Sequence, residues 1–271
     1  MKKNEFFKSH SELYKGYSRS KASLVTLYRN VKRRAAFTLA EVLIALVIIG
    51  VIAAITIPNL TRKWSDHADV QKVKTAYSIL NNAYKMCISE NDTPDNWNWG
   101  KTLPNWASPA PLEECIRPYL KIQKYCGTAN GCAPHQHMSG LNSMYKNLYG
   151  SPSIYSEANR IGKAILSNGM SISYSNNIYI NKDGSTNGGW VTPPIAIDIN
   201  GLKGPNRVGY DLFYFQTTRE SVIPADYNNL NAAHCDRTYD NANSGCGSSC
   251  AEWIIKHGNM DYKYRNVSAE W

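Results

Sequence analysis

The sequence lacks the short motifs by which common catalytic sites are recognised. It contains no G-x-S-x-G, H-E-x-x-H, G-x-G-x-x-G or P-loop pattern. These patterns position a nucleophile, a zinc ion or a phosphate group, so none of those chemistries is indicated. The six histidines are scattered, and His234 beside Cys235 fits a surface turn as well as a catalytic pair. We therefore expect a protein that is not an enzyme.

Most of the chain also lacks an excess of charge. Residues 37–271 hold 20 basic and 19 acidic side chains, whereas residues 1–36 hold ten Lys or Arg and two acids. The first segment thus carries +8 of the formal net charge of +9. Nucleic-acid binding normally requires a basic patch on the folded domain. A near-neutral body makes nucleic acid an unexpected partner.

Cysteine is absent before residue 87, and all seven cysteines lie in the body of the chain. Disulfides persist outside the cytoplasm, so an extracytoplasmic body is expected. Because seven is an odd number, at least one thiol stays free or pairs between chains, and Cys87 is our candidate. The disulfide candidates are Cys115, Cys126, Cys132, Cys235, Cys246 and Cys250.

Zinc is the alternative for the middle cysteines, because His135 and His137 follow Cys132 closely. However, a Cys-x₅-Cys pair followed by His-x-His does not have the spacing of a structural zinc site. Disulfides are therefore favoured there.

One stretch has almost no charge at all. Glu41 is the only charged side chain among the 21 residues from Phe37 to Ile57. As a helix this run extends about 31 Å, enough to cross the hydrocarbon core of a bilayer. We expect a single span, with the basic flank in the cytoplasm and the C-terminal body outside.

Glu41 is the unusual residue of that span, since a carboxylate inside a membrane is costly. One interpretation is that it lies near the interface and stays hydrated. The other is that it has a cationic partner at the same depth. A cut just before Phe37 would create an α-amino group one helical turn before Glu41, in the same subunit or in a neighbour. Glu41 would then fix the register of a helical bundle.

Residues 36–44, AFTLAEVLI, resemble the processing and methylation motif of type IV prepilins and type II secretion pseudopilins. The resemblance implies cleavage between Ala36 and Phe37 and N-methylation of Phe37. It also implies an assembly role for Glu41 and leader recognition through Arg33 and Arg34.

Pro58 matches the helix-bending proline of the same family. Two features depart from the family pattern: Ala36 stands where Gly is usual, and the leader is long at 36 residues.

The resemblance implies a pilin-like structural subunit of a type II secretion pseudopilus or a type IV pilus. Its partners would be copies of itself, related pilins, the prepilin peptidase and methyltransferase, and the membrane. It would reside in the inner (cytoplasmic) membrane and, after assembly, in a periplasmic or extracellular filament. The alternative is an exported enzyme or binding protein on an uncleaved signal anchor. An ordinary secretory signal would have a shorter apolar region.

The predicted fold is α+β, pilin-like: a long N-terminal helix, transmembrane in its first half, packed on a small antiparallel sheet. Apolar residues recur on one helical face at Val70, Val73, Tyr77, Leu80, Tyr84 and Ile88. The expected segments are a removed leader (1–36), the membrane and assembly half of the helix (37–60), its amphipathic half (61–90), an irregular helix–sheet connection (91–168), and the sheet with a cysteine-rich C-terminal loop (169–271).

Three or four strands are predicted after residue 168. The signals are alternating residues at 170–175 and 195–200, an apolar run at 178–180 before a turn, and a short aromatic run at 211–215. Between two of them, Asp198, Asn200 and Asp211 bracket a glycine-containing loop. It loosely resembles the calcium-bearing loop of major secretion pseudopilins, and hard cations prefer such oxygen ligands. The alternative is a plain turn in which the aspartates accept backbone N–H groups. No other cofactor is expected.

Overall fold

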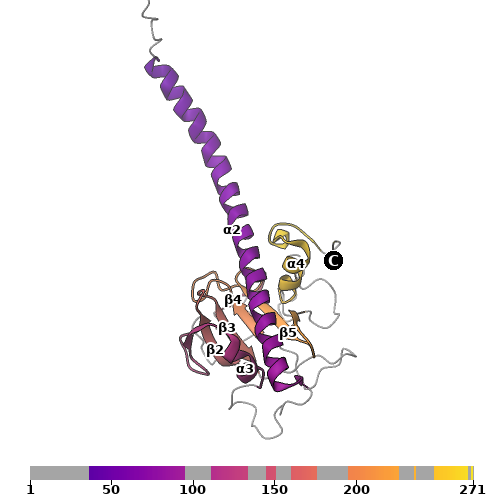
Figure 1. Cartoon of the computed structure of the whole chain (residues 1–271). Coiled ribbons are helices and arrows are strands. Elements are labelled where there is room, and N and C mark those ends of the chain that lie inside the picture. Colours follow the sequence, from indigo (N-terminus) through magenta and orange to yellow (C-terminus); the bar gives the residue numbers. More distant parts are fainter. Residues whose placement is uncertain are drawn as a thin grey trace, which may run out of the picture. The chain divides into compact units, whose positions relative to one another are not determined.

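The computed structural model describes residues 37–94, 111–133, 145–150, 160–175, 195–225, 235, 247–267 and 270. The chain divides into two compact units, Met1–Asn59 and Leu60–Trp271, which we call the first and second units. Figure 1 shows the described elements.

The helix α2 runs from Leu39 to Asn91 and continues through Pro58. In the first unit its apolar side chains are exposed: Leu43, Val47 and Ile48 expose 54%, 65% and 53% of their surface. Of the helices in the described ranges, α2 is the one long and apolar enough to cross a membrane. The predicted span is therefore a helix around which the described residues build no core.

In the second unit the same helix buries one face. The buried residues are Val70, Val73, Ala76, Leu80, Ala83, Tyr84 and Cys87, and Tyr77 and Ile88 pack on the core from its edge. These positions repeat every three to four residues, which is the stripe expected of an amphipathic helix. The buried stripe falls in the part of the helix that the sequence predicts to be amphipathic.

The second unit contains a six-stranded antiparallel sheet in which each strand pairs with its neighbour in sequence. The strands are β1 Ile122–Tyr125, β2 Arg160–Leu166, β3 Ser171–Ser175, β4 Ile195–Asp198, β5 Leu212–Thr217 and β6 Val222–Pro224. The predicted α+β fold with a small antiparallel sheet on a long helix is confirmed. β3, β4 and β5 coincide with the predicted strands at 170–175, 195–200 and 211–215, whereas the predicted apolar run at 178–180 lies outside the described residues.

The sheet begins earlier than the sequence predicts. β1 and β2 lie inside residues 91–168, which we expected to be an irregular connection, and the sheet has six strands in place of three or four. β1 is an edge strand in which three of the four residues are exposed, so it has no apolar stripe. In β2 the buried Gly162 and Lys163 interrupt the apolar pattern.

The central strands are buried on both faces. On one face Ile197 of β4 pairs with Phe213 of β5, and both join the core under α2, where Tyr77 stacks on Phe215 with 6.2 Å between ring centroids. On the other face a second cluster contains Tyr145, Ala196, Val208, Leu212, Tyr214 and Ala225. The sheet therefore lies between two apolar layers, although we predicted only the layer that faces α2.

The described part of the second unit also contains three short helices, which help to position the candidate sites. They are α3 (Pro111–Ile116), η2 (Arg117–Tyr119) and, near the C-terminus, α4 (Cys250–His257). α4 buries Trp253 and Ile254 in the main core and ends at Gly258, whose φ of 69° suits glycine. The 3₁₀ turn η5 (Asp261–Lys263) follows.

Candidate functional site

The start of α2 carries a hydrogen-bonded cap made by two residues of the motif. Thr38 precedes the first helical residue, and its backbone N–H donates to Glu41 Oε2 at 2.8 Å. In return the N–H of Glu41 donates to Thr38 Oγ1 at 3.2 Å, and the Thr38 hydroxyl donates to Glu41 Oε2 at 2.8 Å. This reciprocal pattern is a capping box, which satisfies amide groups that the first helical turn leaves without partners.

The cap was readable from the sequence, because Thr-x-x-Glu before an apolar run is its signature. We had considered for Glu41 only hydration or a cationic partner. Within the described chain its carboxylate is held by Thr38, so the same side chain that marks the motif also starts the helix.

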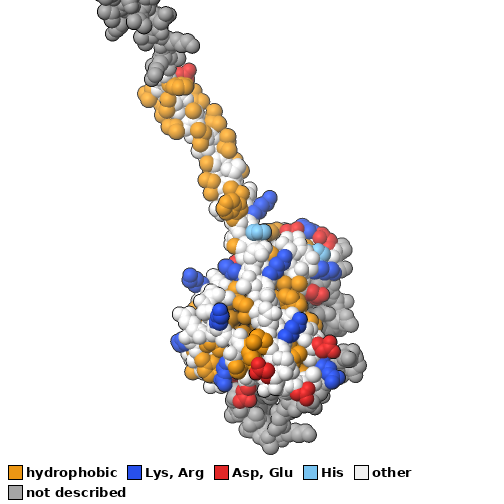
Figure 2. Space-filling model, in the orientation of Figure 1, with side chains coloured by type: hydrophobic (Ala, Val, Ile, Leu, Met, Phe, Trp, Pro, Cys, Tyr) orange, Lys and Arg blue, Asp and Glu red, His pale blue; other side chains and the backbone are white. Residues whose placement is uncertain are grey.

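The predicted processing site lies at the edge of the described residues. Phe37 is 83% exposed and precedes the cap directly. Ala36, Arg33 and Arg34 lie outside the described residues. Beyond Phe37 the helix presents apolar side chains with one acid at its start (Figure 2).

Three disulfides link the second unit: Cys87–Cys115, Cys126–Cys132 and Cys235–Cys250, with Cα–Cα distances of 5.4, 6.0 and 4.9 Å. Our choice of Cys87 as the unpaired thiol was wrong. Cys87 lies seven residues after Leu80 and three after Tyr84, so it shares their buried face and meets Cys115 of α3. Cys246 lies outside the described residues, as do His135 and His137.

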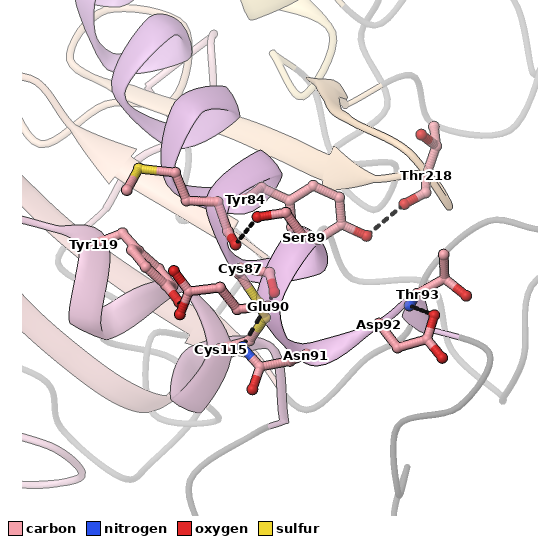
Figure 3. Close-up of a disulfide and its surroundings, with 11 residues drawn as sticks. Tyr84, Cys87, Ser89, Glu90, Asn91, Asp92, Thr93, Cys115, Tyr119 and Thr218 are labelled. Atoms are coloured by element: carbon pink, nitrogen blue, oxygen red, sulfur yellow. Dashed lines mark hydrogen bonds between the residues drawn. A yellow bond between two sulfur atoms is a disulfide. The ribbon is translucent and has the colours of Figure 1, made fainter.

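The Cys87–Cys115 bond fixes the C-terminal end of α2, as Figure 3 shows. Around it Tyr84 Oη donates to the carbonyl of Thr218 at 2.7 Å, and Tyr119 Oη donates to Glu90 Oε2 at 2.6 Å. The helix end is thus tied to the sheet and to η2, which makes this a structural anchor.

Glu113 is the most unusual carboxyl of the described second unit, because its side chain is fully buried. Tyr125 Oη donates to its Oε1 at 2.5 Å, and the Arg117 guanidinium lies 3.8 Å from the same oxygen. Burial raises the pKa of Glu113, and the tyrosine and arginine act in the opposite direction. Oε2 packs against Gly162, where a side chain would collide with it.

The loop that contains the candidate metal ligands brings Asp198, Asn200 and Asp211 together. Asn200 N–H donates to Asp198 Oδ1 at 3.0 Å, and Asn200 Nδ2 donates to Asp211 Oδ2 at 3.3 Å. Tyr145 Oη donates to Asp198 Oδ2 at 2.8 Å. The N–H groups of Asn206 and Arg207 donate to the two oxygens of Asp211 at 2.7 and 2.6 Å.

Each of the four carboxylate oxygens in this loop therefore accepts a hydrogen bond, which is the geometry of the plain-turn alternative. Burial raises the pKa of Asp211, whereas the bonds from Arg207 and Asn206 lower it. The Arg207 side chain donates to the carbonyls of Asn147 and Leu148. Calcium at Asp198, Asn200 and Asp211 stays a prediction.

Within the described residues no group of three or more His, Cys, Asp or Glu side chains could hold a metal ion. Neither Glu113 nor the loop is accompanied by a motif of nucleophilic catalysis. The feature with functional content is therefore the N-terminal segment: an exposed apolar helix, a carboxylate in its first turn and an exposed phenylalanine before it.

Comparison with known proteins agrees with that choice. Residues 31–57 match the family model of the prokaryotic N-terminal methylation motif. No curated protein and no solved structure matches the chain. The chain thus carries, at residues 31–57, the signature of type IV prepilins and pseudopilins.

Proposed function

We propose that the protein is a pilin-like structural subunit that polymerises through the first half of α2. The observation that carries the proposal is the methylation motif placed on a helical segment whose apolar side chains are exposed. Such a surface needs either lipid or other helices around it. A subunit that exchanges lipid for neighbouring helices would be stable both before and after assembly.

The proposed maturation starts with cleavage between Ala36 and Phe37, with Arg33 and Arg34 in the leader recognised by a prepilin peptidase. The new amino group of Phe37 would then be methylated. The basic leader would keep this site at the cytoplasmic face of the inner membrane, with the second unit outside. The proposed filament is a type II secretion pseudopilus or a type IV pilus, built from copies of this chain and related pilins.

N-terminal sequencing and intact mass of the membrane-extracted protein test the processing step. We expect a mature chain that begins with a methylated Phe37. Ala36→Gly should be processed like the natural chain, because a small residue is kept, whereas Ala36→Leu should retain the leader. A chain that still carries residues 1–36 would instead support an uncleaved signal anchor with an exported enzyme or binding protein.

The role of Glu41 needs a variant that separates charge from capping. Glu41→Gln keeps an acceptor for the N–H of Thr38, since Gln also serves in capping boxes, but it removes the negative charge. In a low-dielectric environment that charge would be the partner of a neighbour's terminal amine. We expect Glu41→Gln to give processed monomer in the membrane and few or no filaments in the sheared fraction.

Thr38→Val is the matched control, because it weakens the cap and keeps the charge. We expect it to form filaments. A normal filament yield from Glu41→Gln would show that the charge of Glu41 is not needed for assembly. If only Thr38→Val lost its filaments, the glutamate of the motif would act through helix capping.

A further inference from the structure

A group of cationic and aromatic side chains lies on α2 and beside it at the beginning of the second unit. It consists of Arg62, Lys63 and Trp64 on α2 and Tyr264 from the C-terminal segment, and we call it the collar. Trp64 is 73% exposed and Tyr264 is 57% exposed. Trp is highly buried on average in folded proteins, so the exposure of Trp64 is unusual.

The C-terminal segment is fixed to α2 at this level. Lys263 Nζ lies 3.0 Å from Asp66 Oδ1, and Tyr264 Oη donates to Asp66 Oδ2 at 2.7 Å. The Lys263 side chain is only 5% exposed, so this pair is a buried anchor. It places Tyr264 beside the face of α2 that contains Asp66.

Trp64 lies on another side of the helix. Trp64 precedes Asp66 by two positions, which corresponds to a rotation of about 200° around a helix with 3.6 residues per turn. The two exposed aromatic rings thus stand on different sides of α2. The collar therefore extends over more than one face of the helix.

The collar has a net positive charge. Asp66 is the only acid among residues 60–67, and Lys263 neutralises it. Neither Arg62 nor Lys63 forms an ion pair within the described residues. Their charges are therefore available to an anion.

The collar directly follows the apolar surface of α2. Leu60, 54% exposed, is the last exposed aliphatic residue before it. Arg62 and Trp64 follow Leu60 by about 3 and 6 Å along the helix. The headgroup layer on each side of a bilayer is about 5–8 Å thick. Side chains at this spacing reach the level where Trp and Tyr gather in membrane proteins and where cations meet phosphate groups.

We propose that the collar binds anionic phospholipid headgroups on the side of the membrane that faces the second unit. The indole of Trp64 and the phenol of Tyr264 lie among the headgroups, and Arg62 and Lys63 contact their phosphates. The inference rests on the proposed function only in requiring that α2 spans a membrane. It adds a lipid contact that holds the subunit at a fixed depth before assembly.

The depth is measured with the full chain in phosphatidylcholine nanodiscs by quenching of tryptophan fluorescence. The chain has seven tryptophans, so the Trp64 signal is the difference between the natural chain and Trp64→Phe. We expect lipids brominated near the glycerol end to quench this signal more than lipids brominated near the methyl end. Equal quenching by both, or quenching only by aqueous iodide, would overturn the proposal.

The charge preference is measured with a minor fraction of brominated phosphatidylglycerol in place of brominated phosphatidylcholine. Each cation near an anionic surface raises the affinity about fivefold, so Arg62 and Lys63 together favour the anionic lipid by about 30-fold. We expect several-fold stronger quenching of Trp64 by phosphatidylglycerol, and loss of the preference in the double variant Arg62→Gln, Lys63→Gln.

The matched control is Lys74→Gln with Lys85→Gln, two exposed lysines farther along α2 whose removal changes the net charge equally. This control variant should keep the preference for phosphatidylglycerol. If it loses that preference, the effect comes from the overall charge of the chain.

Filament yield is scored separately. If filaments fail to form while Trp64 is quenched as expected, the polymerisation proposal fails and the collar stands. If a chain with no lipid preference forms filaments, the collar proposal fails and the polymerisation proposal stands.

Discussion

The two halves of α2 are one helix with two different surroundings. Before Ile57 the apolar side chains are exposed around the helix, whereas from Val70 to Cys87 they form a buried stripe against the sheet. In the second half burial in a protein core stabilises the fold, at about 25 cal/mol per Å² of apolar surface. In the first half the described chain provides no core. The difference teaches that apolar content alone does not identify a helix's partner, whereas the arrangement of apolar residues around it does.

The comparison is tested most strongly by the same truncation in each half. Leu80 is fully buried, so Leu80→Ala leaves a cavity and should lower the free energy of unfolding of the second unit by about 4 kcal/mol. Ile48→Ala, at a position that is 53% exposed, should leave that free energy unchanged. Guanidinium unfolding of the full chain in detergent measures both. Equal costs for the two variants would refute the contrast between the halves.

The disulfides of the second unit are expected to stabilise it by different amounts. In the loop-entropy relation, the 28-residue separation of Cys87 and Cys115 corresponds to about 3.5 kcal/mol of stabilisation. The separation of six between Cys126 and Cys132 corresponds to about 2 kcal/mol.

We therefore expect Cys87→Ala with Cys115→Ala to destabilise the second unit more than Cys126→Ala with Cys132→Ala does. Thiol counting under denaturing, non-reducing conditions checks the natural chain. A free Cys87 in protein from the native compartment would contradict the anchor at the end of α2.

Two carboxyl groups extend the comparison to pH. Glu41 in the first unit is exposed, whereas Glu113 in the second is buried, and burial raises the pKa of Glu113 above 4.5. The folded state therefore binds this proton more tightly than the unfolded state. The resulting stabilisation is complete below pH 4.5 and is lost as the pH rises through the higher pKa of the folded state.

Glu113→Gln should reduce this pH dependence, because the amide oxygen still accepts the bond from Tyr125 and no longer titrates. Unfolding free energies measured across the window above pH 4.5 provide the test. Glu41→Gln is the control and should leave the pH dependence of the second unit unchanged. An identical dependence in the natural chain and in Glu113→Gln would show that other groups cause it.

The smallest effect is expected at the loop of Asp198 and Asp211. Because every carboxylate oxygen there already accepts a hydrogen bond, we expect the melting temperature to be unaffected by added Ca²⁺ or by a chelator. A rise with Ca²⁺ that disappears in Asp198→Ala would instead support the calcium prediction, because a ligand that binds only the folded state stabilises it.

Much of this fold was predictable where one physical signal dominated. The stripe from Val70 to Ile88 reflects burial of one face of α2. The alternation in β3 and β4 reflects the large apolar side chains that these strands place in the core with α2. β1 was missed because three of its four residues are exposed and it has no apolar stripe. β2 was missed because Gly162 is required by the packing of Glu113, a contact between segments 49 residues apart that local patterns do not record. The motif predicted Glu41 as a functional residue, whereas its bond to Thr38 follows from capping rules that we had not applied.

The strand order has a consequence for how the second unit folds. Each strand pairs with the one before it, so every new strand completes its ladder with a segment already present, and loop-closure costs stay low. The contact between Lys263 and Asp66 spans 197 residues and forms only when the C-terminal segment has arrived. A chain that emerges from its N-terminal end can therefore build the sheet strand by strand, and the closing of this last contact marks that the whole chain has emerged.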